Sequence, residues 1–293
     1  MKRINVERKP IDKKDYIRRT AHLSDVSRHI NEDVIIYHED KPILLYRVLP
    51  KKPTDVRWAV KNIKYATGKR THGLVNTSAV FGYNPRQENK HDYCSASAMS
   101  NNHPKQHYII SRFAKEVSKY YHEFFPKVYY DHITKYIFKI TTIVMILKLI
   151  IFIYYTTCKH TTINYPLFFY FFFYLVFMIV FKGDVDGGHL VIPELDLSLE
   201  VADNSLTIFD GQDLLHGVSP IEYLHEESYR YSVVYYSLER MWQCMTVDEE
   251  IARIRTKKME REIKRLDPEH LDTLRQRKKE AKNYKESIEN EQK

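Results

Sequence analysis

Acidic residues are missing from one long stretch of this 293-residue chain. No Asp or Glu occurs between Asp131 and Asp184, and residues 137–181 inside that stretch are almost entirely apolar and aromatic. A metal or catalytic site therefore cannot take a carboxylate from this part of the chain. The chain as a whole is basic, with a formal net charge of +8, which is compatible with a polyanionic partner such as nucleic acid.

Cysteine is also scarce. Cys94, Cys158 and Cys244 lie far apart and form no Cys-x-x-Cys pair, so the sequence predicts neither a disulfide framework nor a zinc ribbon. A reducing compartment is the default expectation. The first 16 residues are polar and charged and lack the apolar core of a secretory signal, so we expect a cytoplasmic or nuclear protein.

Composition divides the chain into three parts. Residues 1–30 form a basic N-terminal segment, 31–246 form the main domain, which the apolar block 137–181 interrupts, and 247–293 form a charged tail. The tail has Glu, Lys and Arg at i,i+4 spacing, which predicts solvated helices with a break near Asp267-Pro268.

The remaining patterns predict a mixed α+β fold. Residues 34–49 form two apolar runs around a turn at Pro42 and predict a strand hairpin, and 55–66 predict a short helix. The segment after Pro104 is amphipathic, with Ile109, Phe113 and Val117 on one face. From Met178 onward, short apolar runs alternate with turns at regular spacing, which is typical of a barrel or sandwich.

Three residues in this last region have the chemistry of a binding site. His216 is a candidate metal ligand, and Arg230 follows fourteen positions later on the next strand-like run. Ser232 lies two residues beyond Arg230, on the same face of a strand. A buried arginine needs an anionic partner, and a small dicarboxylate would supply one through bidentate contacts.

Four motifs carry a family resemblance: VFGYNPR (80–86), VDGGHLVIPE (185–194), NSLTIFDGQDLLHGV (204–218) and RYSVVYYSLERMWQC (230–244). They resemble the dioxygenases that depend on 2-oxoglutarate and Fe(II). More narrowly, they are similar to the TET/JBP branch, which oxidises the 5-methyl group of thymine or 5-methylcytosine in DNA. The resemblance covers roughly residues 70–130 and 178–265.

This resemblance implies a double-stranded β-helix, or jelly roll, with N-terminal α/β elements and a charged C-terminal helical extension. It implies Fe(II), 2-oxoglutarate, O2 and DNA as cofactors and partners. His216 would be the distal iron ligand, Arg230 and Ser232 the 2-oxoglutarate clamp, Arg86 a second cosubstrate contact, and Tyr236 a residue that stacks on the base. The target base would be flipped out of the duplex, because its methyl group cannot reach the iron from within the stack.

The sequence departs from the family pattern at the other two iron ligands. The family's His-x-Asp would fall in roughly residues 156–166, where His160 is followed by Thr161 and Thr162. The one formal His-x-Asp, starting at His38, lies in the predicted hairpin turn, and His189 is expected at the surface or behind the ligands. Without a complete triad we expect little or no turnover from this chain.

Three interpretations of the apolar block remain open. Ile140–Thr157 and Tyr165–Phe181 have the length of short membrane spans, with Lys139 and Lys182 at the outer ends. Membrane spans are therefore the first interpretation, and a buried core segment is the second. The third interpretation is that the block results from an out-of-frame reading of AT-rich codons. The alternative function is accordingly a non-enzymatic, membrane-associated or nucleic-acid-binding protein on a degenerate dioxygenase fold. A further alternative keeps the enzyme and changes its substrate to a protein or a small molecule.

Overall fold

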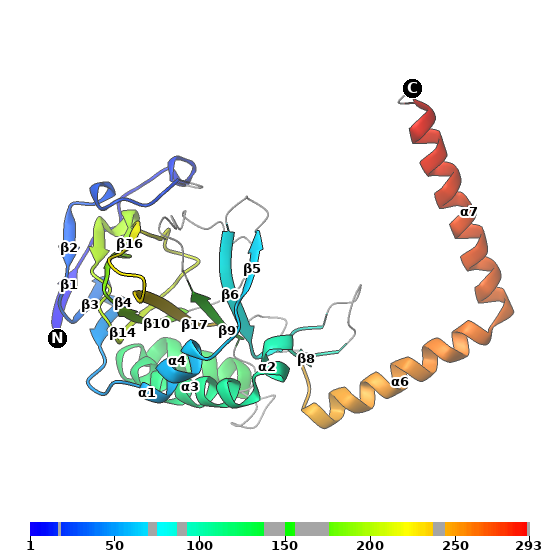
Figure 1. Ribbon diagram of the computed structural model, residues 1–293, viewed down its shortest axis with the longest axis horizontal. Helices are drawn as coiled ribbons and strands as arrows, with labels where there is room; N and C mark the ends of the chain where they lie inside the picture. Colours follow the sequence, from blue (N-terminus) through cyan, green and yellow to red (C-terminus); the bar gives the residue numbers. More distant parts are fainter. Residues whose placement is uncertain are drawn as a thin grey trace. The chain divides into compact units, whose positions relative to one another are not determined.

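The computed structural model describes residues 1–16, 19–69, 75–86, 93–137, 150–155, 176–236 and 244–291 (Figure 1). The chain divides into two compact units. Unit 1 comprises Met1–Pro85 and Ser95–Gln243, and unit 2 comprises Arg86–Cys94 and Cys244–Lys293. The strands and the helices α1 to α4 belong to unit 1, whereas α6 and α7 belong to unit 2.

A nine-stranded sheet is the largest element of unit 1. In spatial order its strands are β1 (Lys2–Asn5), β3 (Val34–His38), β4 (Lys41–Val48), β14 (Ser205–Phe209), β10 (Val176–Gly183), β17 (Tyr229–Tyr236), β9 (Ile150–Tyr155), β6 (Val75–Phe81) and β5 (Ala66–Lys69). Only β1 and β3 pair in parallel. The predicted hairpin is β3–β4, and its turn at Glu39 and Asp40 has positive φ at both residues, as a tight hairpin turn requires.

A second sheet packs against one face of the first. It contains β15 (Gly217–Val218), β12 (Leu190–Ile192), β13 (Leu197–Leu199) and β2 (Arg28–Ile30), and β11 (Val185–Gly187) pairs with β16 (Ile221–Tyr223) beside it. One apolar cluster contains buried side chains of both sheets, including Tyr46 and Val180 from the first and Leu190 and Leu197 from the second. The two sheets therefore share one core, and residues 1–30 contribute a strand to each.

Helices cover the opposite face of the nine-stranded sheet (Figure 1). They are α1 (Thr54–Lys61), the short α2 (Ala98–Asn102), α3 (Pro104–Phe124) and α4 (Pro126–Ile137), and a two-stranded pair, β7 (Tyr83–Asn84) and β8 (Ser95–Ala96), lies beside α2 in the chain. The predicted amphipathic helix is α3. Its buried residues are Ile110, Val117 and Tyr121, and the Tyr235 hydroxyl donates to the Ile110 carbonyl over 3.0 Å.

The apolar block contributes sheet strands where the structure describes it. Residues 150–155 form β9, between β17 and β6, and β10 begins at Val176 between β14 and β17. No described helix is both long and apolar enough to span a bilayer. The described parts of the two proposed spans, residues 150–155 and 176–181, are strands of this sheet, and the membrane interpretation of the other parts stays a prediction. A central strand covered on both faces has no polar alternation, which explains the continuous apolar run of β10. Residues 138–149 and 156–175 lie outside the described residues, and the out-of-frame interpretation of them stays a prediction.

Unit 2 contains two charged helices, α6 (Val247–Leu266) and α7 (Pro268–Glu291), separated at the predicted break by Asp267. Thr246 and Glu249 form a capping box at the start of α6. A disulfide joins Cys94 to Cys244, with their Cα atoms 5.8 Å apart. The expectation that the cysteines form no disulfide is wrong here, because folding brings together two residues that are 150 positions apart in sequence.

Candidate functional site

Arg230 is a buried arginine without a carboxylate partner among the described residues. It lies on β17 and is 2% exposed. Its Nη1 donates to Ser232 Oγ at 2.8 Å and its Nη2 to the Gly188 carbonyl at 3.3 Å, while Nε has no hydrogen-bond partner in the described part of the chain. No ion pair to Arg230 exists among the residues that the structure describes. Burial lowers the pKa of Arg230 to about 10, because the charged form is poorly solvated.

A glycine turn makes room for this guanidinium. Gly187 and Gly188 have φ of +71° and +69°, a region that side chains disfavour. A Cβ on Gly188 would lie 2.9 Å from Arg230 Nε. The Gly188 amide donates to the Pro220 carbonyl at 3.0 Å, which fixes the turn. The two glycines of the GGHLVIP motif thus allow the backbone to approach the arginine closely.

His216 presents one ring nitrogen for coordination. It is half-buried immediately before β15, in the sheet that faces β17 across the shared core. Its Nδ1 lies 2.9 Å from the Leu214 carbonyl, which only accepts, so Nδ1 carries the proton and donates. Burial lowers the pKa of His216 and favours the neutral ring. The Nε2 lone pair is then available, which is the arrangement of a metal-ligating histidine.

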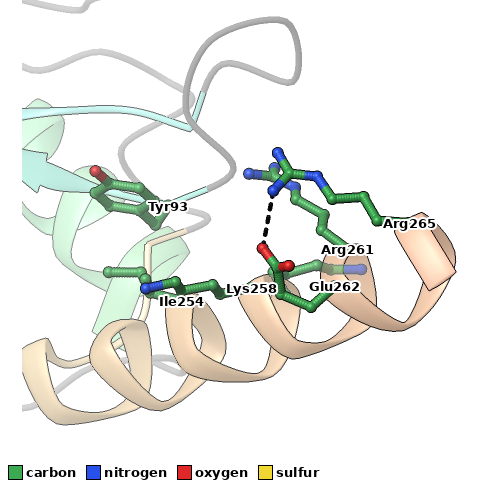
Figure 2. Close-up of a pocket in the computed structure, with 7 residues that line it drawn as sticks. Tyr93, Ile254, Lys258, Arg261, Glu262 and Arg265 are labelled. Atoms are coloured by element: carbon green, nitrogen blue, oxygen red, sulfur yellow. Dashed lines mark hydrogen bonds and ion pairs between the residues drawn. The ribbon is translucent and has the colours of Figure 1, made fainter.

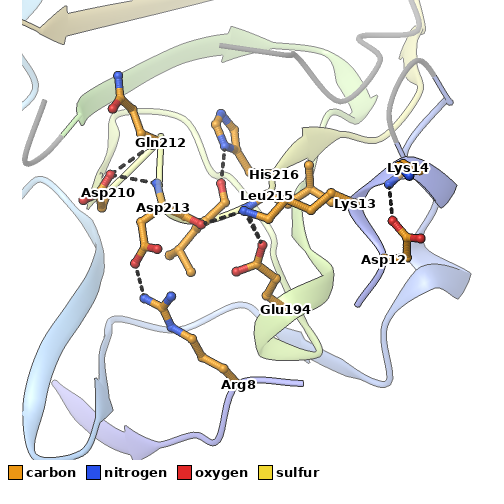
Figure 3. Close-up of polar contacts among 11 residues, drawn as sticks. Arg8, Asp12, Lys13, Lys14, Glu194, Asp210, Gln212, Asp213, Leu215 and His216 are labelled. Atoms are coloured by element: carbon orange, nitrogen blue, oxygen red, sulfur yellow. Dashed lines mark hydrogen bonds and ion pairs between the residues drawn. The ribbon is translucent and has the colours of Figure 1, made fainter. Parts of the chain in front are cut away.

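The N-terminal segment holds the loop that carries His216 (Figure 3). The buried Glu194 accepts from the Leu215 amide and from Lys13 Nζ, each at 3.2 Å. Asp213 forms an ion pair with Arg8. These contacts hold the chain just before His216, so the segment that the sequence marked only as basic positions the candidate ligand.

The described residues do not complete an iron site. No group of three His, Cys, Asp or Glu side chains able to hold a metal exists within the described ranges. Residues 156–166, including His160, lie outside them. His38 lies next to the β3–β4 turn and its Nδ1 donates to the Val6 carbonyl, and Asp40 pairs with Arg3. His189 is half-buried and its amide donates to Ser219 Oγ.

The two remaining predicted residues have different surroundings. Tyr236 is half-buried at the end of β17 and shares the strand face of Arg230, since the two are six positions apart. Arg86 forms an ion pair with the buried Glu250 in unit 2. The structure gives Arg86 a protein partner of its own, and its contact with a cosubstrate stays a prediction.

Lys182 is a candidate that sequence reasoning missed as a site residue. It lies on β10 directly opposite Arg230 in the β10–β17 register, and its side chain is half-buried. Burial, and then the charge of Arg230, lower the pKa of Lys182. Two cations on one face of adjacent strands favour an anion beside them. Only the pairing of β10 with β17 reveals this neighbour, and no local motif encodes it.

Comparisons with known proteins support the fold. No protein-family model matches the sequence, and no curated protein matches it. Among solved structures, the chain is similar to NgTET1 in complex with 5mC DNA, with a TM-score of 0.50 and 13% identity over 78% of this chain and 86% of that one.

Two further solved structures have lower TM-scores. An oxidoreductase of the 2OG-Fe(II) oxygenase family from Burkholderia pseudomallei has a TM-score of 0.44 and 10% identity, over 66% of this chain and 85% of that one. IDO from Bacillus thuringiensis has a TM-score of 0.34 and 13% identity, over 66% and 91%. The similarity to NgTET1 establishes a shared fold, and the chemistry has to be argued from the residues themselves.

Proposed function

We propose that unit 1 is a double-stranded β-helix of the 2-oxoglutarate- and Fe(II)-dependent oxygenase type, directed at the 5-methyl group of a nucleic-acid base, thymine or 5-methylcytosine. The observation that carries this proposal is Arg230, a buried cation with no carboxylate partner in the described residues. Burying an unpaired charge costs several kcal/mol, so a protein that keeps one has a use for it. An anionic ligand that enters the barrel supplies the missing partner.

The residues around Arg230 fit the distal carboxylate of 2-oxoglutarate. The planar guanidinium binds a carboxylate through two parallel hydrogen bonds, and its Nε is free to donate. Ser232 Oγ accepts from Arg230, and its own hydroxyl hydrogen remains available for the same carboxylate. Arg230 and Ser232 would therefore bind and orient the cosubstrate, and the buried position excludes water from it.

Iron has one candidate ligand among the described residues, His216. When bound, Fe(II) would supply the oxidation of the base together with O2 and 2-oxoglutarate. The described residues fit the cosubstrate and do not by themselves fit the metal. Because the sequence has no acid between Asp131 and Asp184, we expect turnover to be low or absent while 2-oxoglutarate binding is retained.

A nucleic-acid base is the proposed substrate for two reasons. The similar structure of NgTET1 contains 5mC DNA, and the present chain carries a net charge of +8. Tyr236, on the strand face of Arg230, is the proposed stacking residue for a flipped base. The second candidate function is nucleic-acid binding without oxidation on the same fold, and the missing acid favours it.

The test uses the purified full-length chain with Fe(II), 2-oxoglutarate and duplex DNA that contains 5-methylcytosine or thymine. We expect 2-oxoglutarate to bind under anaerobic conditions, and little succinate or oxidised base to form in air. Absence of 2-oxoglutarate binding would overturn the proposed function. Succinate formation coupled to base oxidation would confirm the oxygenase and refute the predicted loss of turnover.

A further inference from the structure

Unit 2 contains a pocket of about 360 Å³ on one face of α6. Figure 2 shows Tyr93 facing this helix beside Ile254 and Lys258. The lining is mostly cationic and consists of Tyr93, Ile254, Lys257, Lys258, Arg261, Glu262 and Arg265. Positions 254, 258, 261 and 265 follow the i, i+4, i+7, i+11 spacing of a single helix face.

The charges of this pocket are only partly neutralised within the chain. Arg265 Nη1 pairs with Glu262 Oε1, and Lys257 Nζ pairs with Glu260 Oε2, each at 2.9 Å. Lys258 and Arg261 are exposed and have no acidic partner in the described part of the chain. From Arg253 to Arg265 the sequence has seven basic and two acidic residues. The pocket therefore carries an excess of positive charge beside an aromatic ring.

The wall that carries Tyr93 is fixed to α6 by covalent and polar contacts. The neighbouring Cys94 is joined to Cys244, and the Cys94 amide donates to Glu250 Oε2 at 3.0 Å. Arg86 also pairs with Glu250. Burial alone would raise the pKa of Glu250, but hydrogen bonds, first from Arg86, outweigh it and hold that pKa below its ordinary value. Glu250 is therefore charged at neutral pH and keeps the pocket wall in place.

We propose that this pocket, defined by Tyr93, Lys258, Arg261 and Arg265, binds phosphate groups of a nucleic-acid backbone. Concentrated unpaired lysine and arginine charge is complementary to closely spaced phosphates, and a tyrosine ring offers a surface for a sugar or base. A bilayer would require a broad apolar face in this place, whereas the lining has Ile254 as its only aliphatic side chain.

This inference rests on the proposed function only for the identity of the polyanion. It adds a contact site in unit 2 whose lining includes no residue that is assigned to iron or 2-oxoglutarate. Binding is therefore measured without either of them, and its failure can be distinguished from failure of the oxygenase proposal. A parent chain that binds 2-oxoglutarate but not DNA would overturn the pocket alone. A parent chain that binds DNA but not 2-oxoglutarate would overturn the oxygenase alone.

The experiment compares two double variants of the full chain that remove equal charge. K258A/R261A removes the unpaired pocket cations, and K278A/K279A removes two exposed lysines of α7. Binding of a fluorescein-labelled 20-base-pair duplex is measured by anisotropy over a range of salt concentrations. We expect K258A/R261A to weaken binding at least tenfold and to reduce the salt slope by about 1.8, since each lost phosphate contact removes about 0.9. The K278A/K279A control should stay within twofold of the parent.

Two results would overturn the proposal. Equal losses of DNA affinity in both double variants would show that the net charge of the chain determines DNA binding without a defined pocket. Tight binding to vesicles of phosphatidylserine and phosphatidylcholine, lost in K258A/R261A while DNA binding persists, would identify a membrane surface in place of a nucleic-acid site. Circular dichroism of both variants checks that α6 and α7 remain helical.

Discussion

Two arginines on opposite faces of the same sheet have opposite surroundings. On the helical face, Arg57 of α1 donates from Nη2 to both carboxylate oxygens of Asp203, at 2.8 and 2.7 Å, and to Asn204 Oδ1 at 2.8 Å. Its Nη1 donates to the Tyr229 hydroxyl at 2.7 Å. On the face towards the second sheet, Arg230 has only a hydroxyl and a backbone carbonyl as acceptors within the described ranges.

The pKa shifts of the two arginines follow from this difference. Burial lowers the pKa of Arg57, but hydrogen bonds and charge from Asp203 outweigh it and raise the net pKa. Nothing comparable offsets the burial of Arg230, whose pKa falls to about 10. The protein neutralises Arg57 itself, which makes it a structural residue. The residues that the structure describes leave Arg230 uncompensated, as expected of a residue that receives an anionic ligand.

The largest expected effect comes from R230M. Removing two charge-assisted hydrogen bonds, each contributing about 1.5 kcal/mol or more, should weaken 2-oxoglutarate binding at least 100-fold. Stability should stay the same or rise by about 1–4 kcal/mol, because an apolar side chain replaces an unpaired buried charge. Calorimetric titration measures the affinity, and urea unfolding measures the stability.

R230K is the control for charge. It retains a cation without the planar fork, so its affinity should lie between those of the parent and R230M. A clear loss of stability in R230M with unchanged affinity would contradict the assignment of Arg230 to a ligand.

The matched variant R57M should show the reverse pattern. Removing the Arg57 guanidinium leaves the Asp203 carboxylate without its bidentate partner and the Tyr229 hydroxyl without its donor. Because the pair is half-buried, we expect a loss of about 1–3 kcal/mol in urea unfolding. Affinity for 2-oxoglutarate should change less than twofold, and a larger change would mean that the two faces of the sheet are coupled.

A smaller effect is expected from S232A. The Ser232 hydroxyl accepts from Arg230 Nη1 and is the nearest neutral donor for a carboxylate beside it. Loss of one such hydrogen bond costs about 1 kcal/mol, or roughly fivefold in affinity. Calorimetry of the variant checks this. S228A changes a half-buried residue two positions before Arg230, whose Oγ accepts from the His225 amide, and provides a control that should bind like the parent.

The smallest effect is expected from K182M, at about threefold in 2-oxoglutarate affinity, because the half-buried lysine acts through partly screened charge. Burial lowers the pKa of Lys182 below its ordinary 10.5, so its charge is lost at a lower pH than that of a free lysine. Its contribution to anion binding should therefore decline as pH rises towards 10.5. Titrations at increasing pH should show this decline in the parent and a weaker one in K182M.

Contacts between residues close in sequence were predictable from the sequence. The two-residue period of a strand puts Arg230 and Ser232 on one face, and the structure brings them into contact. The spacing of apolar residues in α3 likewise predicted part of its buried side, since Val117 is buried and Ile109 and Phe113 are partly buried against the same core. In both cases a single element determines which side chains lie together.

Contacts across the fold were not predictable in this way. Lys182 is opposite Arg230 only because β10 pairs with β17, and the Cys94–Cys244 disulfide spans 150 positions. Strand order depends on packing of the whole core, which no local pattern specifies. Membrane spans were one of three interpretations left open for the apolar block, because a strand covered on both faces and a short membrane segment share the same continuous apolar run.

The most direct test of the central claim compares 2-oxoglutarate with 2-oxopentanoate, which has the same carbon chain without the distal carboxylate. Both are titrated into the parent chain and R230M under anaerobic conditions with Fe(II). The account predicts that the parent prefers 2-oxoglutarate by at least 100-fold and that R230M binds the two almost equally. If R230M retained the preference, another group would recognise the distal carboxylate, and the role assigned to Arg230 would be wrong.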